Sequence, residues 1–346
     1  MNNSSPVCQL NNIFSLSQEE VEKEISERFY YAFESFFQDR FKFSRYAKAV
    51  EAIFRLIHGE GKNILDAGCG FGMMSIILSS LGAKKVYSID FSDIETTGFK
   101  KILSKLPPID NLEVKVMDCE RTEFPDNFFD VIVASDSISH INNLENFFKE
   151  ARRILKNKGT FYLYESNNSF NIQHRFFLHK YWKIMECGPV DPRLKMKKPF
   201  SVMRKEMILS HAPGISLAKL DFLVKVTRGM NEKEIKNAVD KYLETGKIKR
   251  KVGFPYVDPH SGMLAEKSIN PFGLKKTLIR FGFQARVLPP YFYYTYPFLT
   301  HPLKNNRYGD MMRFIVKKII RYTYPLSLLT TPRFELLAKN EKNEKT

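Results

Sequence analysis

The sequence is poor in cysteine and in long apolar runs, and each absence excludes a class of protein. Only four of the 346 residues are Cys, without a CxxC pair or a matching His spacing, which argues against a zinc site and a disulfide framework. No run approaches the ~20 continuous apolar residues that a membrane-spanning helix needs. The first residues, MNNSSPVCQLNN, lack the basic and apolar regions of a signal peptide. We therefore expect a cytoplasmic protein without a bound metal.

Positive charge is in clear excess. Lys and Arg number 54 against 38 Asp and Glu, which gives a formal net charge of +16. Such a surplus suits a phosphorylated substrate, a membrane surface or nucleic acid, but a solvated basic surface explains it equally well. The hydrophobic content of 43% is typical of a folded protein.

Short apolar runs alternate with amphipathic helical patterns in the centre of the chain. Such runs, separated by helices, indicate a parallel sheet that is covered on both faces. The expected strands are 63–66, 86–90, 112–117, 131–134 and 160–164, followed late in the chain by 283–288 and 333–338.

Helical segments surround and interrupt this pattern. A capping box, Ser17-Gln18-Glu19-Glu20, predicts a helix that runs on through Phe37, and a second helix is expected over 46–58. Further helices are expected at 170–186, 201–210 and 231–245. The domain division that follows is an N-terminal helical segment 1–60, a core 61–166, a helical insertion 167–269, the end of the core 270–339 with an insertion at 289–332, and a disordered tail 340–346.

The strongest signal is the segment Asp66-Ala67-Gly68-Cys69-Gly70-Phe71-Gly72, which follows a strand and opens a helix. Glycines permit a tight turn and a close approach of a ligand to the backbone, and the helix N-terminus attracts an anionic group. The spacing is GxGxG, with Met73 where the dinucleotide-binding pattern has its third glycine. Asp66, before the first glycine, suits a ligand that carries a positive amino group beside its carboxylate.

Four further elements follow this loop in a consistent order. Asp90 ends the next strand about 20 residues on, where an acid accepts hydrogen bonds from ribose hydroxyls. Asp118 ends the third strand, where a polar side chain can meet an adenine amino group. The run Phe129–Ser135 then precedes Ser139-His140-Ile141, and a helix, a turn and a strand follow between 144 and 160. Each element alone is a weak signal, but the five together are strong.

In this order the segment 63–165 resembles the class I S-adenosylmethionine-dependent methyltransferase domain, particularly the type 11 group. The resemblance implies an α/β fold with a seven-stranded Rossmann-like sheet whose last strand is antiparallel, with N-terminal helices and with helical insertions after strands 5 and 6. It implies S-adenosylmethionine as the cofactor and a small-molecule methyl acceptor. We expect the acceptor to be an oxygen nucleophile on an anionic sugar, lipid-linked or other metabolite. Its negative charge is suggested by the basic residues of the insertion 167–269, among them Lys195, Lys197 and Lys198, and we expect this insertion to form the acceptor lid.

Two alternatives remain open at this point. An RNA methyltransferase is favoured by the positive charge, but the signature motifs of that class are missing, so a nucleic-acid partner is not expected. A non-catalytic partner protein with the cofactor fold would carry an eroded glycine motif, whereas the motif here is intact. The oligomeric state is not indicated.

The resemblance also assigns the cofactor-binding residues. The loop that would hold the methionine portion consists of Asp66, Ala67, Gly68, Cys69, Gly70 and Gly72. Asp90 would bind the ribose hydroxyls, with Phe91 packing on the adenine. Asp118 would face the adenine amino group, and Cys119 would offer its backbone N–H. Ser135 lies where the family lines the path toward the sulfonium.

Two residues are candidates for catalysis. His140 matches a histidine common at this position in the family, and an imidazole can take a proton from a hydroxyl acceptor near neutral pH. The alternative is that it orders the loop. Glu165 ends the fifth strand and could orient the acceptor or act as a base if burial raises its pKa. A strand-end acid exposed to water is the alternative.

The second insertion contains an amphipathic helix over 310–322. Met312, Ile315 and Ile319 share one face with Val316, while Arg313, Lys317 and Arg321 line another. The helix could lie at the inner membrane surface as a peripheral contact, with its cations toward the headgroups. It could instead cover the core of its own domain, and this interpretation is favoured.

Overall fold

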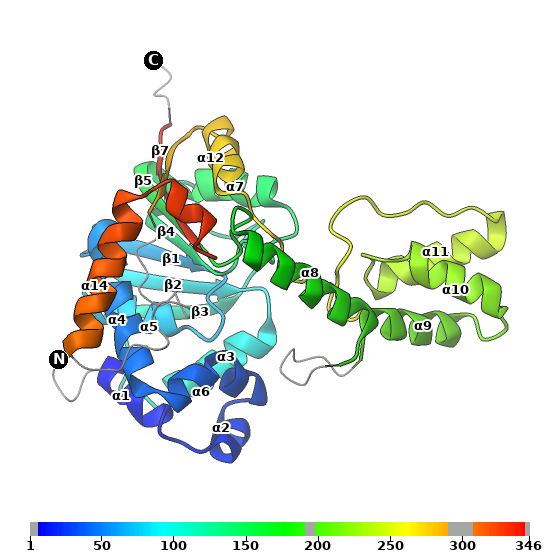
Figure 1. The fold of residues 1–346 in the computed structure, drawn as a ribbon, viewed down its shortest axis with the longest axis horizontal. Helices are drawn as coiled ribbons and strands as arrows, with labels where there is room; N and C mark the ends of the chain where they lie inside the picture. The colour runs from blue at the N-terminus through cyan, green and yellow to red at the C-terminus, as the bar shows by residue number, and fades with distance from the viewer. Residues whose placement is uncertain (1–5, 191–197, 290–306, 343–346) are drawn as a thin grey trace. The chain divides into compact units, whose positions relative to one another are not determined.

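A seven-stranded sheet forms the centre of the computed structural model, which describes residues 6–190, 198–289 and 307–342 (Figure 1). The strand order is β3-β2-β1-β4-β5-β7-β6, in which β1 to β5 pair in parallel and β7 is antiparallel to both β5 and β6. This is the sheet that the sequence predicted. The strands are β1 Asn63–Ala67, β2 Lys85–Asp90, β3 Leu112–Val116, β4 Phe129–Ser135, β5 Leu155–Glu165, β6 Phe283–Leu288 and β7 Phe334–Asn340.

Helices cover both faces of the sheet, since successive side chains of each strand point to opposite faces. On one face, Ile64, Val131 and Tyr162 share a core with the N-terminal helices and with α5 and α6. On the other face, Leu65 and Ile132 share a core with α7 and α12. The helices of this part are α1 Pro6–Ile13, α2 Gln18–Glu24, α3 Glu27–Gln38, α4 Arg40–Leu56, α5 Met73–Ser80, α6 Asp93–Leu103, α7 Leu144–Ile154, α12 Pro271–Arg280 and α14 Arg307–Tyr322, with a 3-10 turn η3 at Leu326–Leu329.

The N-terminal helices differ from the expectation of one long helix. The capping box at Ser17 is present, but α2 ends at Glu24, because the Ser26 side chain accepts a hydrogen bond from Phe29 N (3.1 Å) and so starts α3. The rings of α3 then pack on the glycine-rich loop, with the Phe29 and Phe71 centroids 5.3 Å apart. These helices belong to the same compact unit as the sheet.

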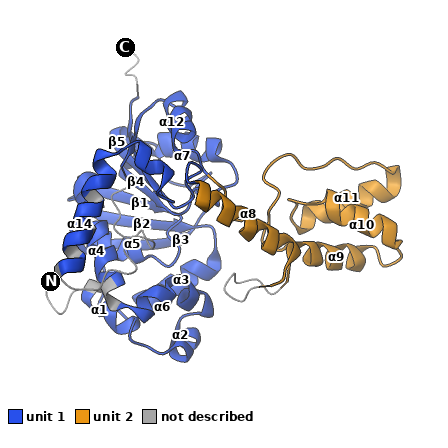
Figure 2. Ribbon diagram, viewed as in Figure 1, with its two compact units in different colours: residues 1–171, 269–346 blue, residues 172–268 orange. Residues whose placement is uncertain are grey.

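The chain divides into two compact units (Figure 2). Unit 1 comprises Met1–Asn171 and Ile269–Thr346, and unit 2 comprises Ile172–Ser268. The helices of unit 2 are α8 Ile172–Cys187, α9 Phe200–His211, α10 Leu217–Val226 and α11 Glu232–Thr245. Of these, α10 was not expected from the sequence.

Unit 2 has its own interior. Leu220, Ile235 and their neighbours form an apolar cluster between α9, α10 and α11, and Trp182 packs against Phe200 nearby. The Arg204 side chain, 1% exposed, forms an ion pair with Glu186. The charge of this buried arginine is therefore balanced by an acid within unit 2.

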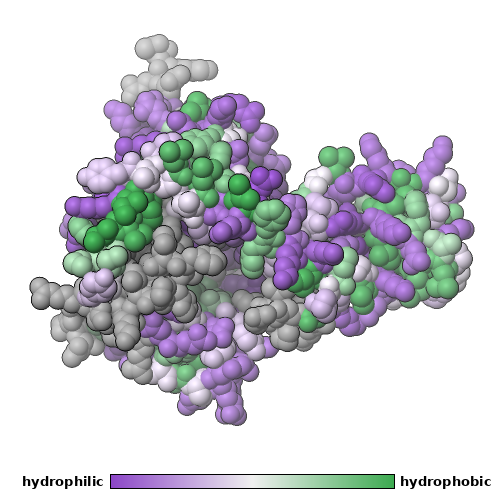
Figure 3. All heavy atoms as spheres, viewed as in Figure 1, coloured by the Kyte–Doolittle hydropathy of each residue, from purple (hydrophilic) through white to green (hydrophobic). Residues whose placement is uncertain are grey.

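The helix expected over 310–322 is present as α14, but its predicted apolar face is not its buried face. Ile320 is 6% exposed, whereas Ile315 and Ile319 of the predicted face are 40% and 55% exposed. Met312 and Val316 are half-buried. Figure 3 shows hydrophobic side chains gathered on the surface over α14 and the turn that follows it. The favoured interpretation of this helix as a core cover was therefore wrong for two of the four residues of that face. No helix in the described parts of the chain is long and apolar enough to cross a membrane.

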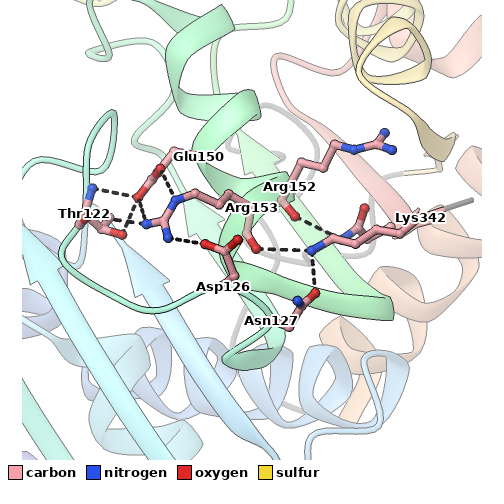
Figure 4. Close-up of polar contacts among 8 residues, drawn as sticks. Thr122, Asp126, Asn127, Glu150, Arg152, Arg153 and Lys342 are labelled. Atoms are coloured by element: carbon pink, nitrogen blue, oxygen red, sulfur yellow. Dashed lines mark hydrogen bonds and ion pairs between the residues drawn. The ribbon is translucent and has the colours of Figure 1, made fainter. Parts of the chain in front are cut away.

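The tail expected to be disordered from residue 340 is instead ordered as far as Lys342. Asn340 is fully buried at the end of β7, and its Nδ2 donates to the carbonyl oxygens of Arg152, Leu155 and Lys156. Figure 4 shows Lys342 donating to Asn127 and to the carbonyl oxygen of Arg153. A composition rich in Lys, Glu and Asn thus predicted disorder where backbone pairing and a buried amide create order. Residues 343–346 lie outside the described residues.

Candidate cofactor-binding site

The glycine-rich loop connects β1 to α5 at the carboxyl edge of the sheet. Gly68 has a φ of +76°, and a Cβ there would lie 2.5 Å from the Ser137 Cβ, so only glycine fits. Gly70 has a φ of +53°, but a Cβ on it would meet nothing within 4 Å. Gly68 is therefore required by close packing against Ser137, while Gly70 leaves open space for a ligand above the loop.

Asp90 ties this loop to the end of β2. One of its carboxylate oxygens accepts a hydrogen bond from Gly70 N (2.9 Å) and the other accepts one from Ser92 N (3.0 Å). Burial raises the pKa of Asp90. Each carboxylate oxygen has two lone pairs, so acceptor capacity remains for ligand hydroxyls. The geometry fits the ribose-binding role that the resemblance gave to Asp90.

Asp66 lies beneath the loop rather than on its surface. It is 2% exposed, and its Oδ2 accepts a hydrogen bond from Ser75 Oγ of α5 (2.6 Å). Ser75 Oγ in turn accepts from Ser88 Oγ of β2 (2.7 Å). Burial raises the pKa of Asp66 to about 7. No sequence pattern pointed to the two serines, which join the acid to the helix and to the neighbouring strand.

The backbone of the loop is also fixed to β2. Gly68 N and Cys69 N both donate to the carbonyl oxygen of Ile89 (2.9 and 3.0 Å). Ala67, the last residue of β1, pairs with the same residue in the sheet register. Burial, with the nearby carboxylates adding to it, raises the pKa of the Cys69 thiol. The thiol is therefore held neutral, and the contribution of Cys69 to a ligand would come from its backbone.

The residues assigned to the adenine follow β2 and β3, which are neighbours in the sheet. Phe91 is 51% exposed, so its ring has an open side on which a base could stack. Asp118 is exposed, and its Oδ1 accepts a hydrogen bond from Glu120 N (2.8 Å). Burial raises the pKa of Cys119 next to it. The carboxyl ends of β1, β2 and β3 thus bring the residues predicted from three separate motifs to one edge.

The loop after β4 closes the other side of this edge. Ser135 ends β4, and Ser137 Oγ donates to the carbonyl oxygen of Ala67 (3.0 Å). Ser137 was missed at the sequence level, because no spacing rule connects a serine after the fourth strand with the loop after the first. His140 is half-buried, and its backbone N–H donates to the carbonyl oxygen of Ser137 (3.0 Å).

Glu165 is fully buried rather than exposed to water. Its carboxylate accepts hydrogen bonds from Ser139 N (3.1 Å), Ser166 N (3.0 Å) and Asn167 Nδ2 (3.0 Å). Because Ser139 directly precedes His140, the first of these bonds holds the backbone that carries the histidine. In the parts of the chain that the structure describes, no group of three His, Cys, Asp or Glu could hold a metal ion.

The arrangement as a whole lies where open α/β sheets bind their ligands. The chain adds β2 and β3 on one side of β1 and then β4 and β5 on the other side, so the strand order reverses between β1 and β4. The loops that follow β1 and β4 meet at this point, where Ser137 Oγ donates to the carbonyl oxygen of Ala67. The first turn of α5, capped by Gly72 without a side chain, presents backbone N–H groups to this edge.

Comparison with known proteins shows which family the central segment of the chain matches. Residues 65–163 match the family described as "Methyltransferase domain", type 11. A ubiquinone biosynthesis O-methyltransferase of Pelagibacter ubique is 34% identical over 46% of this chain and 65% of its own length. The sterol 4-C-methyltransferase strm-1 of Caenorhabditis elegans is 30% identical over 31% of each chain. The similarity therefore spans only part of each relative.

Solved structures include a SAM dependent methyltransferase from Aquifex aeolicus. It is 26% identical, covers 34% of this chain and 63% of its own, and has a TM-score of 0.32. The fold assignment does not depend on this solved structure, because the observed strand order and the matched family both indicate a methyltransferase sheet. Over residues 65–163, which contain the glycine-rich loop, Asp90 and Asp118, this chain is similar to S-adenosylmethionine-dependent methyltransferase domains of the type 11 group.

Proposed function

We propose that this protein transfers the methyl group of S-adenosylmethionine to an oxygen nucleophile of a small-molecule acceptor. One observation carries the proposal: Asp90 holds Gly70 in place while the space over Gly70 stays open, at the edge where β1 and β4 meet. A loop that is fixed from below and open above suits a ligand held by backbone N–H groups and by a carboxylate.

Relatives support a small-molecule acceptor. Their names include sterol and ubiquinone-biosynthesis methyltransferases, and a phosphoethanolamine N-methyltransferase of Arabidopsis thaliana is 32% identical over 29% of this chain. The proposed acceptor is an anionic sugar, lipid-linked or other metabolite. The net charge of +16 supports an anionic group on it.

The residues of the site have different roles in methyl transfer. The bound cofactor supplies a methyl group activated by its positively charged sulfur. Asp90 would accept hydrogen bonds from the ribose hydroxyls, and the first turn of α5 would bind the carboxylate of the methionine portion. The cofactor, when bound, would give its methyl carbon to the acceptor oxygen and keep the electron pair of the carbon–sulfur bond on its sulfur. The protein mainly positions the acceptor in line with that bond and excludes water.

A hydroxyl acceptor must also lose its proton. We propose that His140, on the loop after β4, accepts this proton as a general base, because an imidazole accepts protons near neutral pH. Glu165 then acts as a positioning residue, since its hydrogen bond from Ser139 N fixes the backbone next to His140. Both roles remain predictions.

The two insertions are proposed to set acceptor specificity. They follow β5 and β6, and segments that leave a sheet edge near the ligand crevice can close over it. Several basic residues that suggested this role, including Lys195 and Lys197, lie outside the described residues, as does much of the insertion at 289–332. Lys198 is described, and its Nζ lies 2.7 Å from Glu206 Oε1. Its charge is therefore partly balanced within unit 2.

Thermal unfolding with S-adenosylhomocysteine tests the cofactor assignment. At a concentration of about 100 times the Kd, the ligand stabilises the protein by about 2.7 kcal/mol, which raises Tm by roughly 5–10 °C. NAD and NADP should leave Tm unchanged. Stabilisation by NAD with none by S-adenosylhomocysteine would refute the proposal.

A matched pair of glycine variants makes this test specific for the loop. Gly70 and Gly61 both have positive φ, and a Cβ on either meets nothing within 4 Å, so alanine costs each about 1 kcal/mol of backbone strain. Only Gly70→Ala places a methyl group in the proposed ligand space. It should abolish most of the ligand-induced Tm shift, while Gly61→Ala retains it.

A further inference from the structure

Helix α14 carries a continuous apolar stripe on its exposed side. The positions recur at intervals of three and four residues, the spacing of one helix face. The exposed fractions are 64% for Tyr308, 50% for Met311, 40% for Ile315, 55% for Ile319 and 84% for Tyr322. Beyond the helix, Leu326 and Leu329 of η3 are 70% and 50% exposed.

The helix is already attached to unit 1 through a different face. Gly309 and Ile320 are buried and lie about a third of a turn from the centre of the stripe. The stripe is therefore not needed to hold α14 on the protein. Single exposed apolar side chains are ordinary, but a contiguous set of this length marks an interaction surface.

The charges around the stripe indicate what it binds. Between residues 307 and 329, which span α14 and η3, the sequence has a single acid, Asp310, against five basic residues, which are Arg307, Arg313, Lys317, Lys318 and Arg321. Lys318 is exposed, with its Nζ 4.8 Å from the centroid of the Phe314 ring. A second copy of the chain would bring together two surfaces of the same positive sign, in a protein of net charge +16, which disfavours self-association.

We propose that the surface formed by α14 and η3 docks the protein onto an anionic lipid bilayer. The apolar stripe enters the boundary between headgroups and acyl chains, and the exposed basic residues Lys318 and Arg321 meet the phosphate groups. Tyr308 and Tyr322 at the two ends of the stripe have the apolar ring and polar tip that suit this boundary. Binding of this kind is reversible and needs no membrane-spanning helix. It does not depend on the proposed methyl transfer, so either proposal can fail alone.

Co-sedimentation of the full-length protein with lipid vesicles tests this surface. The protein should sediment with vesicles of phosphatidylcholine mixed with phosphatidylglycerol, and much less with phosphatidylcholine alone. The double variant Ile315→Asp/Ile319→Asp should reduce vesicle partitioning by at least about tenfold, because two large aliphatic side chains no longer leave water. Ile279→Asp on α12, where the side chain is 49% exposed, is the matched control and should leave partitioning unchanged.

The cations are tested separately. Lys318→Gln should lower partitioning into the anionic vesicles by about fivefold, the contribution of one basic residue near such a surface. Lys276→Gln, an exposed lysine on α12, should have little effect. Equal binding to neutral and anionic vesicles would overturn the role of charge.

The same experiments detect two other binding partners of the stripe, a second copy of the chain and another part of the same chain. If sedimentation velocity shows a dimer that the double aspartate variant dissociates, the stripe is a contact between copies and the proposal is wrong. If the double variant lowers Tm well beyond the Ile279→Asp control, the stripe is covered by the chain itself and the proposal is equally wrong. Unchanged Tm and oligomeric state, together with lost vesicle binding, is the expected result.

Discussion

At the residue scale, two aspartates hold the glycine-rich loop from different sides. Asp90 accepts the N–H of Gly70 at the end of β2, and Asp66 binds Ser75 beneath the start of α5. Burial raises the pKa of both carboxyl groups. Polar groups that are costly to bury are retained here because they shape a loop that must stay open to a ligand.

Replacement of Asp90 tests its role in cofactor binding. Asp90→Ala should weaken S-adenosylhomocysteine binding by about 1.5–3 kcal/mol, as expected for the loss of charge-assisted hydrogen bonds. Isothermal titration calorimetry measures this directly. The control is Asp130→Ala at the start of β4, where the carboxylate accepts from Asn63 N (3.0 Å) and Lys156 Nζ (2.8 Å) at the opposite edge of the sheet. A loss of affinity as large in Asp130→Ala would show that the effect is only structural.

The raised pKa of Asp66 predicts a pH dependence of stability. Its pKa is about 7 in the folded protein and near 4 in the unfolded chain, so the folded state binds the proton more tightly. The resulting stability is complete below about pH 4, falls as the pH rises toward 7, and is absent above that range. In Asp66→Asn, the amide oxygen can still accept from Ser75, but nothing titrates.

Urea unfolding of both proteins between pH 4 and 8 measures this difference. The free energy of unfolding of the natural protein should decline relative to that of Asp66→Asn across this range. Parallel pH curves for the two proteins would mean that Asp66 is charged in the folded state.

The sequence was sufficient to locate these residues but not to orient them. Glycine at 68 and 70 and an acid at the end of the second strand follow from what a ligand-binding turn requires, and the structure places them together. The partners Ser75, Ser88 and Ser137 could not be predicted, because each contact joins residues that are distant in sequence or has no characteristic spacing.

At the scale of elements, burial on both faces made the central strands predictable. The apolar runs of β1, β2 and β4 leave no other assignment, and each strand was expected within a few residues of its observed bounds. The ends of the helices and their buried faces were harder to predict. The break between α2 and α3 depends on Ser26 as the N-cap of α3. Which face of α14 is buried depends on the part of unit 1 that the helix packs against. A periodic pattern identifies an apolar face but does not say whether that face is covered.

The end of β7 gives a prediction at this scale. The Asn340 amide donates to three carbonyl oxygens at the junction of α7 and β5, so Asn340→Ala should lower the free energy of unfolding by about 1–3 kcal/mol. Asn340→Asp should cost more, because a carboxylate would face the same oxygens. Urea unfolding measures both.

Lys342 provides the control for Asn340. Its contacts with Asn127 and the Arg153 carbonyl oxygen are at the surface (Figure 4), where such bonds contribute little. Lys342→Ala should therefore change the free energy of unfolding by less than about 1 kcal/mol. Equal effects of Asn340→Ala and Lys342→Ala would contradict the special role of the buried amide.

At the scale of the whole molecule, the insertion that forms unit 2 leaves unit 1 and returns to it at neighbouring points. Ile269 N donates to the carbonyl oxygen of Asn167 (2.7 Å), and Ser169 N donates to the carbonyl oxygen of Ile269 (2.9 Å). Each apolar cluster of the described residues lies wholly within one unit. The cofactor site is likewise built from unit 1 alone, so the insertion can be removed without opening the core that supports it.

Excision of unit 2 therefore separates cofactor binding from acceptor recognition. A variant in which a short Gly/Ser linker replaces residues 172–268 should fold and bind S-adenosylhomocysteine with a Kd within about threefold of the natural protein. If the insertion sets acceptor specificity, this variant should not methylate acceptors in a metabolite extract that the full chain methylates with labelled S-adenosylmethionine. The point variant Lys198→Glu, in the intact chain, should raise KM for an anionic acceptor while leaving cofactor affinity unchanged. Full methylation activity in the excised variant would show that unit 2 has no part in acceptor recognition, and the loss of S-adenosylhomocysteine binding by a folded variant would show that unit 1 does not hold the cofactor alone.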